Sequence, residues 1–219
     1  MLFATFAIVF AVFASWGGAE RFGFGWFSLT AALVAIAYAW GNPSLFGRRG
    51  DGTIPLWRRV ALFPYTMFVH GVWHVQRLLL REPPWHQIAR GIYLGRWPRE
   101  KDCPPEVTLV VDLTAELPKA AMGSFAYLLT PTLDGCSPDV EALERLAQRV
   151  ATHDGVSYVH CAAGHGRSAT VVAAALAIRG THGTLDEVIE HLRSVRPGVR
   201  INSVQRAVLD RWAKSRPVR

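Results

Sequence analysis

The sequence contains little cysteine, and its basic residues are not grouped with aromatic ones. Three cysteines occur in 219 residues, Cys103, Cys136 and Cys161, and no two of them are close together. An odd number of widely spaced cysteines excludes a disulfide framework and fits a reducing compartment, where a free thiol persists. There is no internal repeat and no low-complexity segment. The absence of a basic stripe interleaved with aromatics predicts that nucleic acid is not a partner.

Charge is also missing from two long runs at the start of the chain. Residues 1–16 and 22–40 contain no charged side chain. The second run has aromatics near its ends, and as a helix it matches the roughly 30 Å hydrocarbon core of a bilayer. Together the runs predict a transmembrane helical hairpin within residues 1–47, because helices satisfy their own backbone polar groups in lipid. A cleaved signal peptide is the alternative, but the positive N-terminal region of such a peptide is absent.

The net charge of +7 is concentrated beside these apolar runs. Residues 1–81 contain seven arginines, no lysine and two acids, whereas the remainder is nearly balanced. Four of the arginines follow the second run: Arg48, Arg49, Arg58 and Arg59. The positive-inside rule therefore predicts that both termini face the cytoplasm. Arginines flank an apolar stretch in residues 48–85, and this pattern predicts a basic juxtamembrane segment that lies in the membrane interface. We expect an integral protein of the lipid bilayer, in a bacterial inner membrane.

Strand and helix patterns alternate in residues 86–219. Apolar and β-branched runs predict strands at residues 91–95, 107–113, 126–129 and 156–160. Helical periodicity predicts helices at residues 138–153, 167–179, 185–195 and 203–214, with Ser137, Thr184 and Asn202 as caps of three of them. This alternation indicates an α/β domain with a mostly parallel central sheet flanked by helices.

The reactive chemistry lies where the fourth predicted strand meets the second of these helices. The sequence there is His160-Cys161-Ala162-Ala163-Gly164-His165-Gly166-Arg167-Ser168. A loop that ends at a helix N-terminus can curl its backbone N–H groups around an anion, and Gly164 and Gly166 permit a tight curl. Arg167 can hold two phosphate oxygens with its planar guanidinium. The same positive field favours a thiolate on Cys161, beneath a bound phosphate.

This segment resembles the signature of the protein-tyrosine phosphatase superfamily, His-Cys-five residues-Arg-Ser/Thr. Further similarity to a compact dual-specificity phosphatase is carried by residues 91–95, 111–116 and 196–197 and by Asn202 and Gln205. The resemblance covers about residues 86–219, and nothing in residues 1–81 belongs to it. It implies a cysteine-dependent phosphatase domain, which we expect in the cytoplasm.

The resemblance also implies a set of catalytic roles. Cys161 attacks phosphorus to form a phosphocysteine, Ser168 helps this thiolate to leave, and His160 supports the loop. The phosphate-binding groups are the backbone of Ala162, Ala163, Gly164, His165, Gly166 and Arg167, together with the Arg167 guanidinium. No metal or other cofactor is required, because the loop itself supplies positive charge.

A general acid is needed as well, since an unprotonated ester oxygen leaves poorly. The family carries an aspartate on a mobile loop before the cysteine. Asp134 follows a predicted strand in a turn-rich stretch and is the expected acid. Asp112, in an apolar strand, and Asp154, in a turn before the cysteine strand, are the alternatives.

The substrate is open between two classes. The family default is a protein-tyrosine or dual-specificity phosphatase that acts on phosphoproteins, and this is the first expectation. The alternative is a phospholipid phosphatase, similar to the mitochondrial phosphatidylglycerophosphate phosphatase, with its site held at the headgroups by the anchor. Loop lysines typical of members acting on phosphoinositides are absent, because Ala162, Ala163 and His165 fill the variable positions. An inactive phosphate-binding adaptor is a third class, disfavoured by the complete catalytic set.

Overall fold

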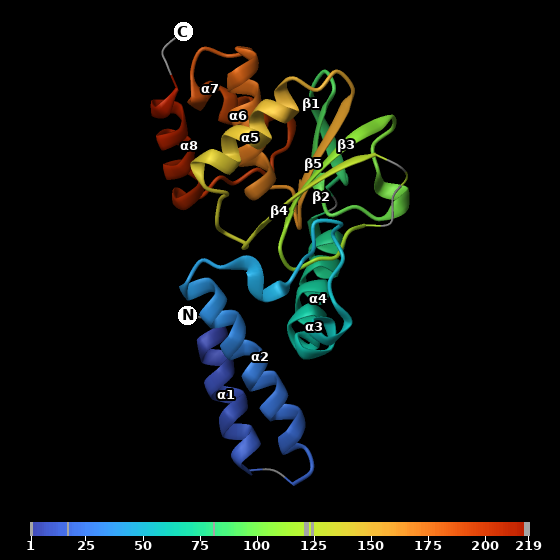
Figure 1. Cartoon of the computed structure of the whole chain (residues 1–219), viewed down its shortest axis with the longest axis vertical. Helices are drawn as coiled ribbons and strands as arrows, with labels where there is room; N and C mark the ends of the chain where they lie inside the picture. Colours follow the sequence, from blue (N-terminus) through green and yellow to red (C-terminus); the bar gives the residue numbers. More distant parts are fainter. Residues whose placement is uncertain (1, 17, 81, 121–122, 124, 217–219) are drawn as a thin grey trace. The chain divides into compact units, whose positions relative to one another are not determined.

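The computed structural model describes the chain except for residues 1, 17, 81, 121–122, 124 and 217–219. Contacts divide the chain into two compact units, residues 1–81 and residues 82–219. Both units are drawn in Figure 1. The division into three parts that the sequence suggests stays a prediction.

The first unit is helical. Its elements are α1 (Leu2–Trp16), α2 (Arg21–Ala39), the 3₁₀ helix η1 (Pro43–Phe46), α3 (Leu56–Ala61) and α4 (Phe63–Leu80). α1 and α2 pack along each other, which confirms the helical hairpin. The side chains of Trp26 and Thr30 on α2 both donate hydrogen bonds of 3.0 Å to the carbonyl of Ala61. The Trp26 ring also stacks on Phe63, so the junction of α3 and α4 is fixed against α2.

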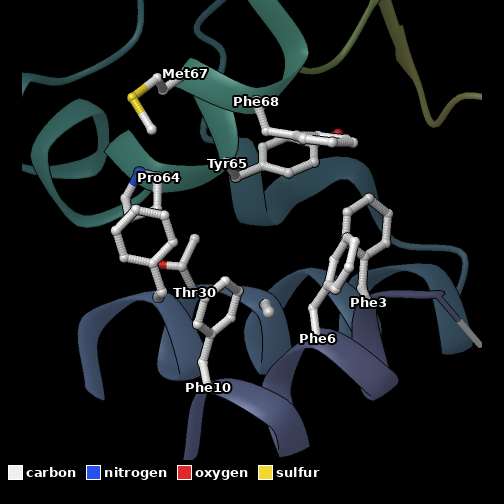
Figure 2. Close-up of a pocket in the computed structure, with 10 residues that line it drawn as sticks. Phe3, Phe6, Phe10, Thr30, Pro64, Tyr65, Met67 and Phe68 are labelled. Atoms are coloured by element: carbon white, nitrogen blue, oxygen red, sulfur yellow. The ribbon is translucent and has the colours of Figure 1, made fainter. Parts of the chain in front are cut away.

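An apolar cavity of about 240 Å³ lies between α1, α2 and α4. Figure 2 shows phenylalanine rings of α1 on one side of it and Tyr65 and Phe68 of α4 on the other. The rings of Phe3 and Tyr65 meet edge to face, with centroids 5.6 Å apart. Aromatic pairs therefore contribute to the packing of α1 against α4.

Among the described residues, α2 is the one helix long and apolar enough to cross a membrane. α1 is also apolar, but its 15 residues fall short of the roughly 20 that a bilayer span requires. Large apolar side chains are exposed along α3 and α4, among them Leu56, Trp57, Phe63 and Met67. This exposure agrees with the interfacial segment expected here, and insertion of the hairpin into a membrane stays a prediction.

The second unit is an α/β domain built on a five-stranded sheet in the order β1-β2-β5-β3-β4. The strands are β1 (Trp85–Ala89), β2 (Ile92–Arg96), β3 (Val107–Thr114), β4 (Ala126–Thr132) and β5 (Val156–Cys161). β1 and β2 pair antiparallel, and the other three pairs are parallel. The mostly parallel sheet is thus confirmed, and β1 is a strand that the sequence pattern did not reveal.

Among the described residues, the second unit has four α-helices: α5 (Val140–Ala151), α6 (Arg167–Arg179), α7 (Leu185–Val195) and α8 (Ser203–Ser215). α6 and α7 contact the sheet, and α5 and α8 pack on α6. Figure 1 shows them gathered around α6, which is buried along most of its length. Thr184 and Asn202 cap α7 and α8 as expected. The expectation of a Ser137 cap is wrong: α5 begins two residues later than expected, so Asp139 is the cap and accepts from the Ala142 N–H.

The order of the strands places Cys161 at the carboxyl end of the central strand of the sheet. β5 lies between β2 and β3, and its last residue, Cys161, leads directly into the turn before α6. In parallel sheets, the carboxyl ends of neighbouring strands meet at one edge, where ligands bind. The chain segments that follow β3 and β4 therefore lie beside this turn.

Candidate active site

Neighbouring segments of the chain hold the loop of residues 161–167 by donating hydrogen bonds to its carbonyl groups. Four consecutive carbonyls accept hydrogen bonds: Ala162 from the Trp97 N–H at 3.1 Å, Ala163 and Gly164 from the Arg196 guanidinium at 3.2 and 3.1 Å, and His165 from the Arg200 N–H at 2.9 Å. In a planar trans peptide, each N–H points away from the preceding C=O. Anchoring these carbonyls therefore directs the N–H groups of residues 163–166 to the opposite side, which forms a cradle for an anion.

The Cys161 sulfur lies at the base of this cradle. The Gly164 N–H donates to it at 3.2 Å and the Ser168 hydroxyl at 3.3 Å, and the side chain is almost fully buried. The sulfur thus accepts one hydrogen bond from the backbone of the loop and one from the first turn of α6. Gly164 has φ of +78°, and a Cβ there would lie 2.3 Å from the carbonyl carbon of Gly95, so only glycine fits this turn.

Arg167 is a buried cation at the end of the loop. Its guanidinium makes a two-point contact with Glu116, at 3.0 and 2.8 Å, and donates to the Thr132 carbonyl at 2.8 Å. Burial alone would lower the pKa of Arg167, but the charges of Glu116 and Cys161 outweigh it and raise the pKa well above its ordinary value. The arginine therefore stays protonated although its side chain is only 1% exposed.

Asp134, the expected acid, lies at the rim of the same site. Its Oδ1 atom is 3.2 Å from the Arg167 guanidinium, and its side chain is 76% exposed. The turn that carries it is tied to the start of α8, because Asn202 Nδ2 and Gln205 Nε2 donate to the carbonyls of residues 135–136 at 2.8 and 3.0 Å. The carboxylate is therefore held beside Arg167 by a turn with two side-chain hydrogen bonds, and it stays accessible to a substrate.

The two alternative acids lie elsewhere. Asp112 is fully buried in β3, where it accepts from Thr114 and from the Tyr127 hydroxyl and lies 3.9 Å from His160. Asp154 precedes β5 and is therefore at the opposite end of that strand from the cysteine. Of the three aspartates, Asp134 is the one that the fold brings to the cradle.

Two carboxylates, those of Glu116 and Glu82, lie at the active site although the sequence analysis did not predict them there. Glu116 lies two residues after the end of β3, and only the strand order shows that this end of β3 lies beside the loop. Glu82 lies behind the loop, where it pairs with Arg196 at 2.9 Å and with His165 at 2.6 Å. The arrangement as a whole, a buried sulfur under an anion cradle with a fixed cation and a carboxylate at the rim, is suited to displacement at phosphorus.

Comparison with known proteins gives a consistent result. Residues 92–215 match a family profile described as dual specificity phosphatase, catalytic domain. Two curated plant proteins of Arabidopsis thaliana, the phosphatidylglycerophosphate phosphatases PTPMT2 and PTPMT1, are each 30% identical, over 144 and 135 residues. These alignments cover 59% and 55% of this chain, and 63% and 40% of the relatives, so the chain spans less than two thirds of either. The plant relatives lend no support to a bacterial inner membrane.

Solved structures show the same fold. The structure of human DUSP28 is 25% identical with a TM-score of 0.54, and the similarity covers 61% of this chain and 95% of that one. The structure of Tk-PTP in the active form is 28% identical with a TM-score of 0.52, over 61% of this chain and 99% of that one.

Proposed function

The chain belongs to the dual specificity phosphatase family, and from this premise we propose that it hydrolyses the phosphomonoester of a phospholipid of the phosphatidylglycerophosphate type. The observation that carries this substrate is the similarity to two Arabidopsis phosphatidylglycerophosphate phosphatases. The N-terminal unit supports it, because α2 has the length and composition of a membrane span. A lipid substrate thus has more support than the phosphoprotein that the sequence alone favoured.

In the first step, the Cys161 thiolate attacks phosphorus and the bond to the ester oxygen breaks. The N–H groups of the loop and the Arg167 guanidinium hold the non-bridging oxygens, whose charge they stabilise in the transition state. Asp134 donates its proton to the departing lipid alcohol. The position of Asp134 supports this role, because its exposed side chain lies next to the arginine that holds the phosphate oxygens.

In the second step, water hydrolyses the phosphocysteine. Asp134, now ionised, takes a proton from the attacking water, and the sulfur leaves as a thiolate. The Ser168 hydroxyl, 3.3 Å from the sulfur, stabilises the charge that returns to Cys161. His160 supports the loop from β5 beside the buried Asp112. Inorganic phosphate then dissociates from the cradle.

The test uses the full chain, purified in detergent and transferred to phospholipid nanodiscs. Phosphate release is measured from phosphatidylglycerophosphate, from a phosphatidylinositol monophosphate and from tyrosine- and threonine-phosphorylated peptides. We expect kcat/KM for phosphatidylglycerophosphate to exceed that for every peptide by at least about 10²-fold, with no release by Cys161→Ser. A higher kcat/KM for any phosphopeptide would overturn the lipid proposal and restore the phosphoprotein one.

A further inference from the structure

A buried charged cluster lies behind the phosphate-binding loop, outside the catalytic set. The carboxylate of Glu82 accepts hydrogen bonds through Oε2 from His165 at 2.6 Å and from Arg196 at 2.9 Å. Arg196 is fully buried, and the side chains of Glu82 and His165 are 15% and 20% exposed. The backbone makes room for this pair, because a Cβ at Gly198 would lie 2.4 Å from His165 Nε2 and 2.9 Å from Glu82 Oε1.

Arg196 connects this cluster to the cradle. Its Nε and NH2 groups bind the carbonyls of Gly164 and Ala163, and its NH1 group lies 2.9 Å from His86 Nδ1. These two peptide groups direct the N–H groups of residues 164 and 165, and the Gly164 N–H is the one that points at the Cys161 sulfur. The orientation of the Arg196 guanidinium therefore sets the direction of two donors in the cradle.

Glu82 provides the charge that holds both partners. Burial lowers the pKa of Arg196, and the charge of Glu82 opposes this change. Burial would raise the pKa of Glu82, but the hydrogen bond from His165 and the charges of Arg196 and His86 lower it below its ordinary value. Glu82 is therefore ionised at neutral pH. It accepts hydrogen bonds both from His165, a residue of the loop itself, and from Arg196.

We propose that Glu82 is a positioning residue for phosphoryl transfer, which acts through His165 and Arg196 to aim the backbone donors of the loop. The proposal rests on the phosphate-binding role of the loop and not on the lipid substrate. Glu82 is the first residue of the second unit and follows the end of α4 by two positions. The first residue of the second unit is thus part of the proposed support of the active site.

The test is Glu82→Gln in the full chain, a change that keeps the size of the side chain and removes its charge. The matched control is Glu190→Gln, because Glu190 is 75% exposed and pairs only with Arg193 of its own helix among the contacts of the described residues. Hydrolysis of a soluble aryl phosphate, inhibition by orthovanadate and thermal unfolding are measured. Vanadate reports the cradle, because it occupies the place of the transferring phosphoryl group.

We expect Glu82→Gln to lower kcat and to weaken vanadate inhibition, each by roughly 10-fold or more, as small displacements of reacting groups cost about this much. Glu82→Asp, which keeps the charge, should recover part of both losses, and the control should match the wild type. The double variant Glu82→Gln/His165→Asn should be no worse than Glu82→Gln alone, because the side chain of His165 acts through its contact with Glu82.

Wild-type vanadate inhibition in Glu82→Gln overturns the proposal, even if its melting temperature falls, since stability alone would then be affected. If Glu82→Gln does not fold, His165→Asn decides: weaker vanadate inhibition, by about 3-fold, is expected, and no change overturns the proposal. Neither outcome bears on the lipid substrate, which these reagents do not contain.

Discussion

The contact between Glu116 and Arg167 gives the sharpest test of the active-site geometry. Glu116 is 4% exposed and Arg167 is 1% exposed, and two hydrogen bonds join their charged groups. Glu116→Gln keeps the shape of the side chain but removes the charge that compensates the buried guanidinium. It also turns an NH₂ group toward an arginine that can only donate, so at least one of the two hydrogen bonds is lost.

The expected magnitude follows from this burial. Removal of one partner from a buried ion pair costs about 3–5 kcal/mol, because the other charge is left uncompensated. The Thr132 carbonyl and Asp134 still contact Arg167, so we expect the lower end, about 3 kcal/mol. For a domain of this size, about 3 kcal/mol corresponds to a fall in melting temperature of roughly 10 °C.

The assay combines thermal unfolding of the full chain with hydrolysis of an aryl phosphate. A guanidinium freed from Glu116 loses the orientation that serves two phosphate oxygens, so kcat/KM should fall by at least about 10²-fold. Glu190→Gln is again the control for a change of the same chemistry at an exposed position. A melting temperature within about 2 °C of the wild type, with kcat/KM within twofold, would refute the reasoning, because Arg167 would then be held without Glu116.

Four further predictions concern the nucleophile, the acid, the pH dependence and the topology. Cys161→Ser should abolish turnover without lowering the melting temperature, since a serine hydroxyl is not ionised in this site; substantial residual turnover would show a different nucleophile. Asp134→Asn should lower turnover by roughly 10²- to 10⁴-fold for poor leaving groups and much less for an activated aryl phosphate, and an equal loss across a leaving-group series would remove Asp134 from the role. The pKa of Glu82 is lower in the folded chain than in the unfolded chain, so the ionised carboxylate stabilises the fold. This stabilisation is complete at pH values above the unfolded pKa and is lost as the pH falls through the folded pKa. Acid unfolding curves of Glu82→Gln should therefore be shallower than those of the wild type, and identical slopes would contradict this coupling. A reporter active only outside the cytoplasm, fused to the C-terminus, should stay silent, and a strong signal would reverse the predicted orientation.

The part of the site that lies in one continuous segment could be predicted from the sequence. Cys161 ends a buried strand, and Arg167 and Ser168 open a buried helix, so their mutual placement is set by local geometry. The bonds from Gly164 and Ser168 to the cysteine sulfur are contacts within this segment. The α/β class and most helix boundaries were predictable for the same reason, because periodicity and capping are local properties.

The support of the site could not be predicted, because it depends on contacts over long sequence separations. Glu116 is 51 residues from Arg167, and Glu82 is 83 residues from His165. A single glutamate in a sequence carries no periodic signal, and its partner emerges only when the strand order is known. The strand β1 was not predicted for a related reason. Its five residues have no regular alternation of buried and exposed positions, and the strand is stabilised by its pairing with β2.

The two buried carboxylates show why stability and catalysis make different demands on this domain. Each compensates a buried arginine, Glu116 in front of the loop and Glu82 behind it. A buried ion pair contributes little net stability compared with apolar residues of equal volume, because both charges lose their hydration. The pairs are therefore poorly explained as devices that hold the fold together. Their geometry fits the proposed mechanism better: Glu116 holds Arg167, the cation to which that mechanism assigns the phosphate oxygens. Glu82 holds Arg196, which binds the carbonyls of Ala163 and Gly164. In this proposal the loop motif supplies the groups that bind a phosphoryl oxygen, and these two carboxylates from distant parts of the chain orient those groups.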